Sequence, residues 1–173
     1  PLVDGWVGGM PGLSSVSIVP KARTATVGGG TYLRDIEDMA ARHGLMFAPY
    51  PSSRRLCGIG GMIGNNASGE KSLRFGPTSE HIAELEVVLA SGEVIRLTPK
   101  RISAVRGNRR EEQLLALYRE HAEILSQALG DVVKAASGYR LDAIIRNGMF
   151  HEAMLFAGAQ GTLGIVTKAV LNL

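Results

Sequence analysis

The chain has 173 residues, of which 45% are hydrophobic and 20% are charged, and its formal net charge is +3. This length and apolar content suffice for one buried core, which argues against a disordered chain. No apolar run approaches the roughly 18 residues of a membrane-spanning helix, so we expect no membrane span. The single cysteine, Cys57, cannot form an internal disulfide, which fits a reducing compartment, and we expect a cytoplasmic protein.

The first half of the chain has the pattern of strands followed by a helix. Apolar and polar residues alternate over residues 16–27, which predicts two short strands with a turn at Pro20-Lys21, and Gly28 to Gly30 end the second strand. Thr31 is predicted to cap a helix that ends at Gly44 in the left-handed conformation. The apolar face of this helix is formed by Leu33, Ile36, Met39 and Ala40.

A long segment without periodicity follows, and then a hairpin. Residues 48–76 are rich in Pro, Gly, Ser and Asn, and an irregular connection of that length usually has a function. β-Branched runs at 85–90 and 94–97 flank Ser91-Gly92, which predicts a two-residue hairpin turn.

The second half is predicted to contain one amphipathic helix and two strands. Leucines at helical spacing predict a helix over 111–129. A strand over 154–157, a glycine-rich turn over 158–164 and an apolar strand from Ile165 complete the chain, and the predicted fold class is α+β. The basic stretch from Arg101 to Arg110 has no interleaved aromatic residues, so we interpret it as a solvated loop and expect no nucleic-acid partner.

The glycine-rich segment 49–76 is the candidate binding element. Its glycines allow a ligand to approach backbone N–H groups, which suits a large, polar, partly anionic cofactor; a loop shaped only by tight packing is the alternative. A Rossmann fingerprint fails, because the frame that starts at Gly58 places Ile63 at the sixth position. A P-loop also fails, because Glu70 stands where the lysine is required.

Six sequence blocks in order carry a family resemblance. They are APYPSS (48–53), CGIGGMIGNNASG (57–69), LRFG (73–76), LEVVLASGEVI (85–95), SGYRLD (137–142) and GAQGTLGIVT (158–167). Together they resemble FAD-linked oxidases with the vanillyl-alcohol-oxidase (PCMH) type of FAD-binding domain, in the branch of D-lactate dehydrogenase, D-2-hydroxyglutarate dehydrogenase and the glycolate oxidase flavin subunit. The resemblance implies a mixed or antiparallel sheet flanked by helices. It also implies that residues 1–173 are one truncated domain, without its upstream pyrophosphate loop and its downstream substrate domain.

The resemblance further implies that the cofactor is non-covalent FAD. Pro51 and Ser53 would line the flavin side and Ile165 would meet the adenine end. Cys57 would lie beside the cofactor without a covalent link, because the linking cysteine of covalent relatives aligns with Leu56. The complete implied set is Pro51, Ser53, Cys57, Gly60, Gly61, Asn66, Ser68, Gly69, Gly76 and Ile165.

We expect no catalytic residue within this chain. Oxidation of a 2-hydroxy acid needs a base, most simply a histidine, but no histidine belongs to the glycine-rich segment. The four histidines are His43, His81, His121 and His151. No Cys or His cluster has metal-ligand spacing, so we expect no metal site.

The favoured function is hydride transfer to FAD from a small 2-hydroxy acid such as D-lactate or glycolate. The acid would bind through the absent domain, and the residues do not identify the electron acceptor. Three departures from the family pattern keep a second hypothesis open, a degenerate module for binding or assembly without catalysis. Tyr50 replaces an acidic residue, Phe75 replaces a tyrosine and Gln160 replaces a glutamate.

Overall fold

A five-stranded antiparallel sheet forms the centre of the molecule. The computed structural model describes residues 9–128 and 138–173. The strand order of the sheet is β1-β2-β8-β3-β4, and every neighbouring pair is antiparallel. The strands are β1 (Val16–Val19), β2 (Thr24–Gly28), β3 (Ile82–Val88), β4 (Val94–Leu97) and β8 (Ile165–Asn172). The predicted α+β class with an antiparallel sheet is confirmed.

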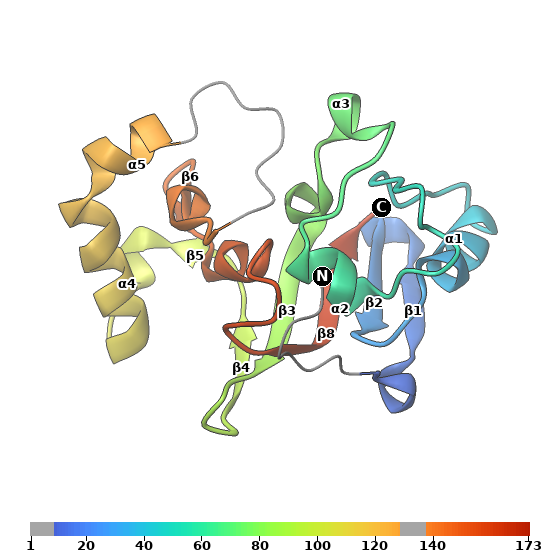
Figure 1. Cartoon of the computed structure of the whole chain (residues 1–173), viewed down its shortest axis with the longest axis horizontal. Helices are drawn as coiled ribbons and strands as arrows, with labels where there is room; N and C mark the ends of the chain where they lie inside the picture. Colours follow the sequence, from blue (N-terminus) through green and yellow to red (C-terminus); the bar gives the residue numbers. More distant parts are fainter. Residues whose placement is uncertain (1–8, 129–137) are drawn as a thin grey trace, which may run out of the picture.

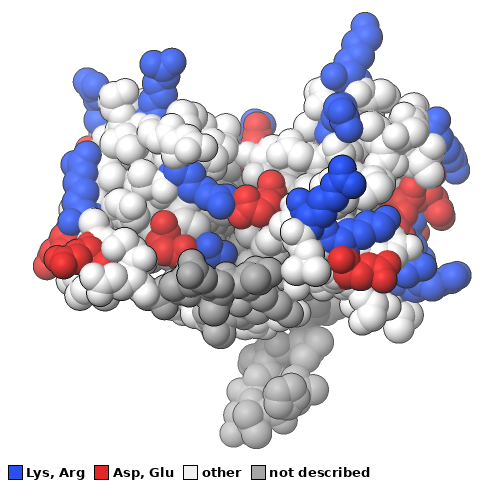
Figure 2. All heavy atoms as spheres, turned by 90° about the horizontal axis from the view of Figure 1, so that it is seen from above, with Lys and Arg blue, Asp and Glu red and all other residues white. Residues whose placement is uncertain are grey.

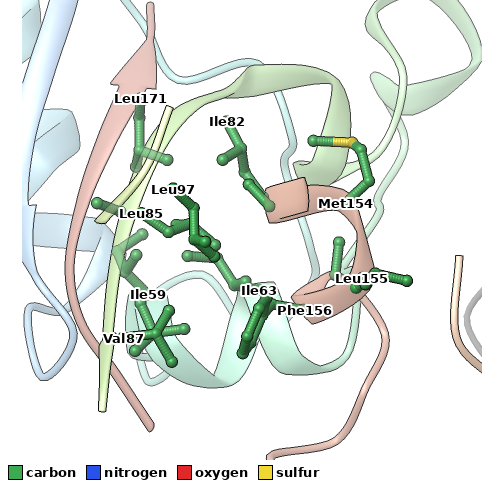
Figure 3. Packing of buried hydrophobic residues seen from close by; sticks show 14 of the residues in the cluster. Ile59, Ile63, Ile82, Leu85, Val87, Leu97, Met154, Leu155, Phe156 and Leu171 are labelled. Carbon is green, nitrogen blue, oxygen red and sulfur yellow. The ribbon is translucent and has the colours of Figure 1, made fainter. Parts of the chain in front are cut away.

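One face of this sheet carries the core. Buried and more exposed residues alternate along β2, β3, β4 and β8, so that the buried apolar side chains lie on one side. Helix α1 (Leu33–Ala41), helix α2 (Ile59–Gly64) and the 3₁₀ helix η6 (Glu152–Phe156) contribute buried side chains to the same cluster. Figure 3 shows Leu85 and Val87 of the sheet grouped with Ile59 of α2 and Phe156 of η6.

A smaller unit lies at the opposite end of the molecule from α1 (Figure 1). Its three-stranded sheet has the order β5-β7-β6, and helices α4 and α5 lie beside it. The elements are β5 (Lys100–Arg101), α4 (Arg109–Glu120), α5 (Ala122–Ala128), β6 (Ile145–Arg146) and β7 (Met149–Phe150). The remaining helix is α3 (Ser72–Phe75), and single 3₁₀ turns cover Pro11–Leu13, Pro20–Ala22, Thr78–His81, Ile102–Ala104 and Leu141–Ala143.

Two of the sequence predictions around α1 have different outcomes. The helix and its left-handed terminal residue are confirmed, with φ +68° at Gly44. The N-cap prediction is wrong, because Tyr32 holds that position and Thr31 makes no capping bond. The Thr31 hydroxyl instead donates to the Ser15 carbonyl at 2.9 Å and accepts from the Ser15 N–H at 3.0 Å, so it joins α1 to the segment before β1.

The prediction that residues 48–76 form one irregular connection is wrong. The segment contains α2 and α3. Three of the six residues of α2 are glycines, which disfavour a helix, but Ile59, Met62 and Ile63 are buried at helical spacing. Tertiary packing therefore stabilises a helix that local propensity opposes.

Three further elements also differ from the predictions, in type, continuity or length. The expected strand over 154–157 is the 3₁₀ helix η6, since a fully buried apolar run has no periodicity that separates strand from helix. The expected helix over 111–129 is divided at His121 into α4 and α5, and its last residue lies outside the described part. The hairpin turn is longer than two residues, because the Leu89 N–H donates to the Glu93 carbonyl at 2.9 Å across Gly92 in the left-handed conformation.

Close backbone contacts at Gly28 to Gly30 join the N-terminal segment to the sheet. A Cβ on these three glycines would lie 1.9, 2.0 and 1.9 Å from the carbonyl oxygens of Leu13, Val166 and Met10, respectively. No side chain fits between these backbones. The triple glycine therefore has a steric role that its position at the end of a strand did not reveal.

Two carboxylates are buried where α4 meets η6 and β5. Glu152 is 6% exposed and accepts from Arg110 Nε at 2.7 Å, while Glu111 accepts from Lys100 Nζ at 2.8 Å. Burial raises the pKa of Glu152, and the hydrogen bond from Arg110 offsets part of this rise. The two ion pairs, Arg110–Glu152 and Lys100–Glu111, fix α4 against η6 and β5.

The surface carries both signs of charge. Figure 2 shows Lys and Arg side chains at both sides of the molecule with Asp and Glu among them, rather than one basic patch. In the described part of the chain, no helix is long and apolar enough to cross a membrane.

The first prediction concerns the triple glycine. Gly30→Ala places a methyl group 1.9 Å from the Met10 carbonyl oxygen, so we expect a loss of about 2 to 3 kcal/mol in unfolding free energy. Urea denaturation measures it. Gly12→Ala is the matched control, because a Cβ there meets nothing within 4 Å. Equal stability of Gly30→Ala and the parent would contradict the steric role.

The second prediction concerns Glu152. Arg110→Met leaves this buried carboxylate without its partner, so we expect a loss of about 2 to 3 kcal/mol at pH 7.5 and a smaller loss at pH 5. The sign follows from the raised pKa, because the folded state gains from protonation at low pH and loses that gain as the pH rises through the folded pKa. Denaturation at both pH values tests this. Arg96→Met removes an exposed pair with Glu84 and should show no such pH dependence.

Candidate functional site

Helix α2 is held by backbone bonds to the segment after β2. The Gly60 N–H donates to the Gly29 carbonyl at 2.8 Å, and the Ile59 N–H donates to the Thr31 carbonyl at 2.9 Å. The first backbone N–H groups of a helix have no acceptor within the helix, and these two carbonyls supply acceptors for α2. These bonds set the direction in which the glycines of α2 face.

The glycine-rich turn over 158–164 packs on the other end of α2. The Gly158 N–H donates to the Ile63 carbonyl at 3.0 Å, and the Gln160 N–H donates to the Gly64 carbonyl at 2.8 Å. The Gln160 side chain adds a bond from Nε2 to Asn65 Oδ1 at 3.2 Å, with its backbone at φ +55°. The turn and the helix therefore form one hydrogen-bonded unit.

A hollow of about 540 Å³ lies where α2, the glycine-rich turn and the start of β8 meet. Of the ten residues expected from the sequence, it brings together Gly60, Gly61 and Ile165. Three glycines that were not expected from the sequence also line it, Gly64, Gly161 and Gly164. The other lining residues are Met10, Phe156, Ala159, Gln160 and Val166. The lining contains no charged side chain, so this wall offers backbone and apolar contacts.

Gly61 is an open position of this wall. It is exposed, and a Cβ built on it would meet nothing within 4 Å. Gly60 is more confined, with the Gly29 carbonyl oxygen 3.0 Å from its built Cβ. A flat ligand can therefore approach the α2 backbone at Gly61 without a side chain in its path.

A second group of expected residues surrounds Pro51. Pro51 is buried, and a Cβ on Gly69 would lie 1.8 Å from the Tyr50 carbonyl oxygen, so the two loop segments touch through their backbones. Ser53 is exposed and Ser68 is half-buried. These four residues do not line the 540 Å³ hollow.

Asn66 and Gly76 have structural partners of their own. Asn66 is fully buried at φ +43°, and its Oδ1 accepts from the Ser79 N–H at 3.0 Å. Gly76 ends α3 at φ +81°, where a Cβ would lie 2.5 Å from Glu80 Cγ. Both residues hold the segment that leads from α2 into β3.

Cys57 is half-buried next to the start of α2. Burial raises the pKa of its thiol, and a hydrogen bond with the Ser53 side chain lowers it in part. A raised pKa leaves less thiolate at neutral pH, and the thiolate is the reactive form. The environment of Cys57 therefore favours an inert thiol.

The histidines lie outside the hollow, whose lining contains none. His81 Nε2 is 2.9 Å from the Phe75 carbonyl oxygen, and its ring stacks edge-on against Phe47. Burial, followed by the charge of Arg146, lowers the pKa of His151. Within residues 9–128 and 138–173, no group of three or more His, Cys, Asp or Glu side chains is arranged to hold a metal ion.

The chain is similar in sequence to a protein family and to several named proteins. A family model described as "FAD binding domain" matches residues 4–98. D-lactate dehydrogenase of Archaeoglobus fulgidus is 28% identical over 173 residues, 100% of this chain and 29% of that protein. Glycolate oxidase subunit GlcD of Bacillus subtilis is 31% identical over 150 residues, 87% of this chain and 23% of that protein.

Two further likenesses extend this set. D-2-hydroxyglutarate dehydrogenase of Pseudomonas putida is 32% identical over 160 residues, 87% of this chain and 16% of that protein. A solved structure of alkyldihydroxyacetonephosphate synthase superposes with a TM-score of 0.59 at 17% identity, over 95% of this chain and 23% of that one. This last likeness concerns the fold alone. The chain spans less than a third of the curated relatives named here.

The third prediction concerns Cys57. Because burial raises the pKa of its thiol, we expect iodoacetamide to alkylate the folded chain more slowly at pH 8 than the urea-unfolded chain. Ser53→Ala removes the bond that lowers this pKa and should slow the reaction further. Mass spectrometry of timed samples measures both rates. Faster alkylation of the folded parent would show an activated thiol instead.

Proposed function

This chain belongs to the FAD binding domain family, and we propose that it is the FAD-binding part of an enzyme that oxidises a small 2-hydroxy acid. The observation that carries the proposal is the glycine-walled hollow between α2, the glycine-rich turn and β8. The three relatives are named for D-lactate, glycolate and D-2-hydroxyglutarate, which share a hydroxyl group next to a carboxylate. That shared group defines the proposed substrate class.

The residues suggest how each end of the cofactor would be held. The wall at Gly60, Gly61 and Ile165 suits the flat, uncharged adenine end, because it offers backbone and apolar contacts. Pro51 and Ser53, with Ser68 and Gly69 beside them, would line the flavin end. Asn66 and Gly76 would keep the connecting segment in place, and Cys57 would lie beside the cofactor.

We propose a non-covalent complex. The raised pKa of Cys57 opposes the thiolate that a thioether link requires. When bound, FAD accepts the hydride from the α-carbon of the acid. The residues of this chain bind and orient, and the base that takes the hydroxyl proton would come from another part of the protein, since no histidine lines the hollow. A cytoplasmic location remains part of the proposal.

The decisive experiment is a titration of the purified chain with FAD, followed by flavin fluorescence. Saturable binding supports the proposal, and no binding up to millimolar FAD by a longer chain of the same protein contradicts it. In a protein that includes the substrate domain, D-lactate or glycolate should bleach the flavin absorption band. Bound flavin that no 2-hydroxy acid reduces would favour the alternative of a module without catalysis.

The fourth prediction concerns Gly61. Gly61→Val should weaken FAD binding about tenfold or more, because a branched side chain occupies the open wall. The fold should persist, because the new Cβ meets nothing within 4 Å. Flavin titration and thermal melting measure the two effects. Ala122→Val on the exposed surface of α5 is the control, and equal FAD affinity of Gly61→Val and the parent would remove Gly61 from the site.

A further inference from the structure

The segment that contains the sequence block SGYRLD contributes no residue to the proposed cofactor site, yet it contacts elements at both ends of that site. Residues 139–146, called the bridging segment below, comprise the end of this block, the 3₁₀ turn Leu141–Ala143 and β6. Ile144 is fully buried in the core, and the Ala143 N–H donates to the Arg140 carbonyl at 3.0 Å. The bridging segment is therefore anchored in the core.

An ion pair orders the first half of the bridging segment. Arg140 Nε donates to Asp142 Oδ1 at 3.0 Å, and Arg140 Nη2 donates to Asp142 Oδ2 at 3.0 Å. The two side chains are only 15% and 20% exposed, so water and salt screen this pair less than a pair on the open surface. The pair restrains the backbone next to Tyr139.

The first contact of the bridging segment joins Tyr139 to the glycine-rich turn. Tyr139 Oη lies 3.0 Å from Thr162 Oγ1, and Thr162 Oγ1 donates to the Ala159 carbonyl at 2.6 Å. Because a threonine hydroxyl has one hydrogen, Tyr139 is the donor to Thr162. Gln160 and Gly161 of this turn line the hollow at α2 with φ values of +55° and +80°. The bond from Tyr139 thus restrains a turn whose backbone conformation is uncommon.

The second contact joins Arg146 of β6 to Glu80. Arg146 Nη1 donates to Glu80 Oε2 at 2.8 Å, and Arg146 Nη2 donates to Glu80 Oε1 at 2.9 Å, which is the paired geometry that a guanidinium and a carboxylate favour. A Cβ on Gly76 would lie 2.5 Å from Glu80 Cγ, so the stem of Glu80 packs on the backbone at Gly76. The Gly76 N–H donates to the Ser72 carbonyl, and the Gly69 N–H donates to Ser72 Oγ, both at 2.9 Å. Contacts therefore lead from Arg146 to Gly69.

We propose that the bridging segment positions both ends of the cofactor site, with Tyr139 acting on the turn at the adenine end and Arg146 acting through Glu80 on the flavin end. The identity of the ligand rests on the proposed function, whereas the two contacts do not. Neither residue lines the hollow at α2, so both are positioning residues. Walls that are held in place before binding reduce the ordering cost that the ligand must offset.

The two contacts act at different ends, so their loss should affect different ligands. ADP carries the adenine end of FAD without the flavin. Tyr139→Phe keeps the ring and removes the hydroxyl, and we expect about threefold weaker binding of both FAD and ADP. Arg146→Gln should weaken FAD binding about threefold and leave ADP binding unchanged. A merely structural role of Arg146 predicts no such difference between the two ligands.

The affinities are measured by titrating a longer chain of the same protein with FAD, followed by flavin fluorescence, and with ADP, followed by calorimetry. Arg146→Lys should restore part of the FAD affinity, because it keeps the charge and loses the planar fork. Arg96→Gln is the matched control for Arg146→Gln, since it removes an exposed pair with Glu84. Tyr118→Phe on α4 is the control for Tyr139→Phe, since Tyr118 does not line the hollow. Circular dichroism melting confirms that each variant is folded.

Hydrogen–deuterium exchange of the ligand-free protein tests the two contacts without any cofactor. Tyr139→Phe should speed exchange about threefold at the Thr162 N–H, which donates to the Ala159 carbonyl at 3.0 Å. Arg146→Gln should speed exchange by a similar factor at the Gly76 N–H. Each substitution should leave the other site unchanged, because the two contacts lie at different elements.

Three outcomes would overturn the inference: unchanged exchange at both sites, unchanged FAD affinity in both variants, or an equal loss of ADP affinity for Arg146→Gln and Tyr139→Phe. The failure of the proposed function gives a different result. If the parent binds no FAD while exchange changes as expected at both sites, the proposed function is contradicted and the positioning contacts stand. If the parent binds FAD and neither substitution changes the affinity, this inference alone is contradicted.

Discussion

The close backbone contact at Gly28 to Gly30 is the constraint on which the rest of the site depends. The Gly29 N–H donates to the Thr167 carbonyl at 2.8 Å, while the Gly29 carbonyl accepts from the Gly60 N–H at the same distance. One residue thus connects β2 to both β8 and α2. Because no side chain intervenes, α2 begins against the sheet, and a hollow walled by backbone remains beside it.

The two hollows differ in the chemistry they offer. The hollow at α2 has no charged side chain in its lining, whereas a second hollow, of about 390 Å³ beside α1, is lined by three arginines and by the carboxylates of Glu37 and Asp38. In the proposed enzyme, the hollow at α2 suits the extended cofactor. Tyr50 replaces an acidic residue of the family pattern, and in the sequence this replacement favoured the alternative of a module without catalysis. Its ring lies 4.2 Å from Arg54 Cζ and 4.3 Å from Lys71 Nζ, so the tyrosine makes cation–π contacts that an acidic residue would not make.

Local pattern predicted the elements that have one solvated face. The strands of the main sheet and the helix α1 alternate buried and exposed positions, so their periodicity predicted them. Elements buried on all sides have no such periodicity, and their secondary structure was not predicted correctly. Residues 154–157 were predicted as a strand, but the run Glu152–Phe156 is buried throughout and forms a 3₁₀ helix. Helix α2 was missed because its three glycines oppose the helical state that packing of Ile59 and Ile63 enforces.

The sequence by itself determined the α+β class, the antiparallel sheet and the family, because ordered blocks and alternating polarity are properties of the chain. It also predicted ten cofactor residues, and three of these, Gly60, Gly61 and Ile165, line one hollow. Only the tertiary structure decided that the turn at Gln160 closes on α2, since Gln160 and Asn65 lie 95 residues apart in the chain. Contacts between backbones leave no spacing pattern, so this closure could not be predicted from the residues.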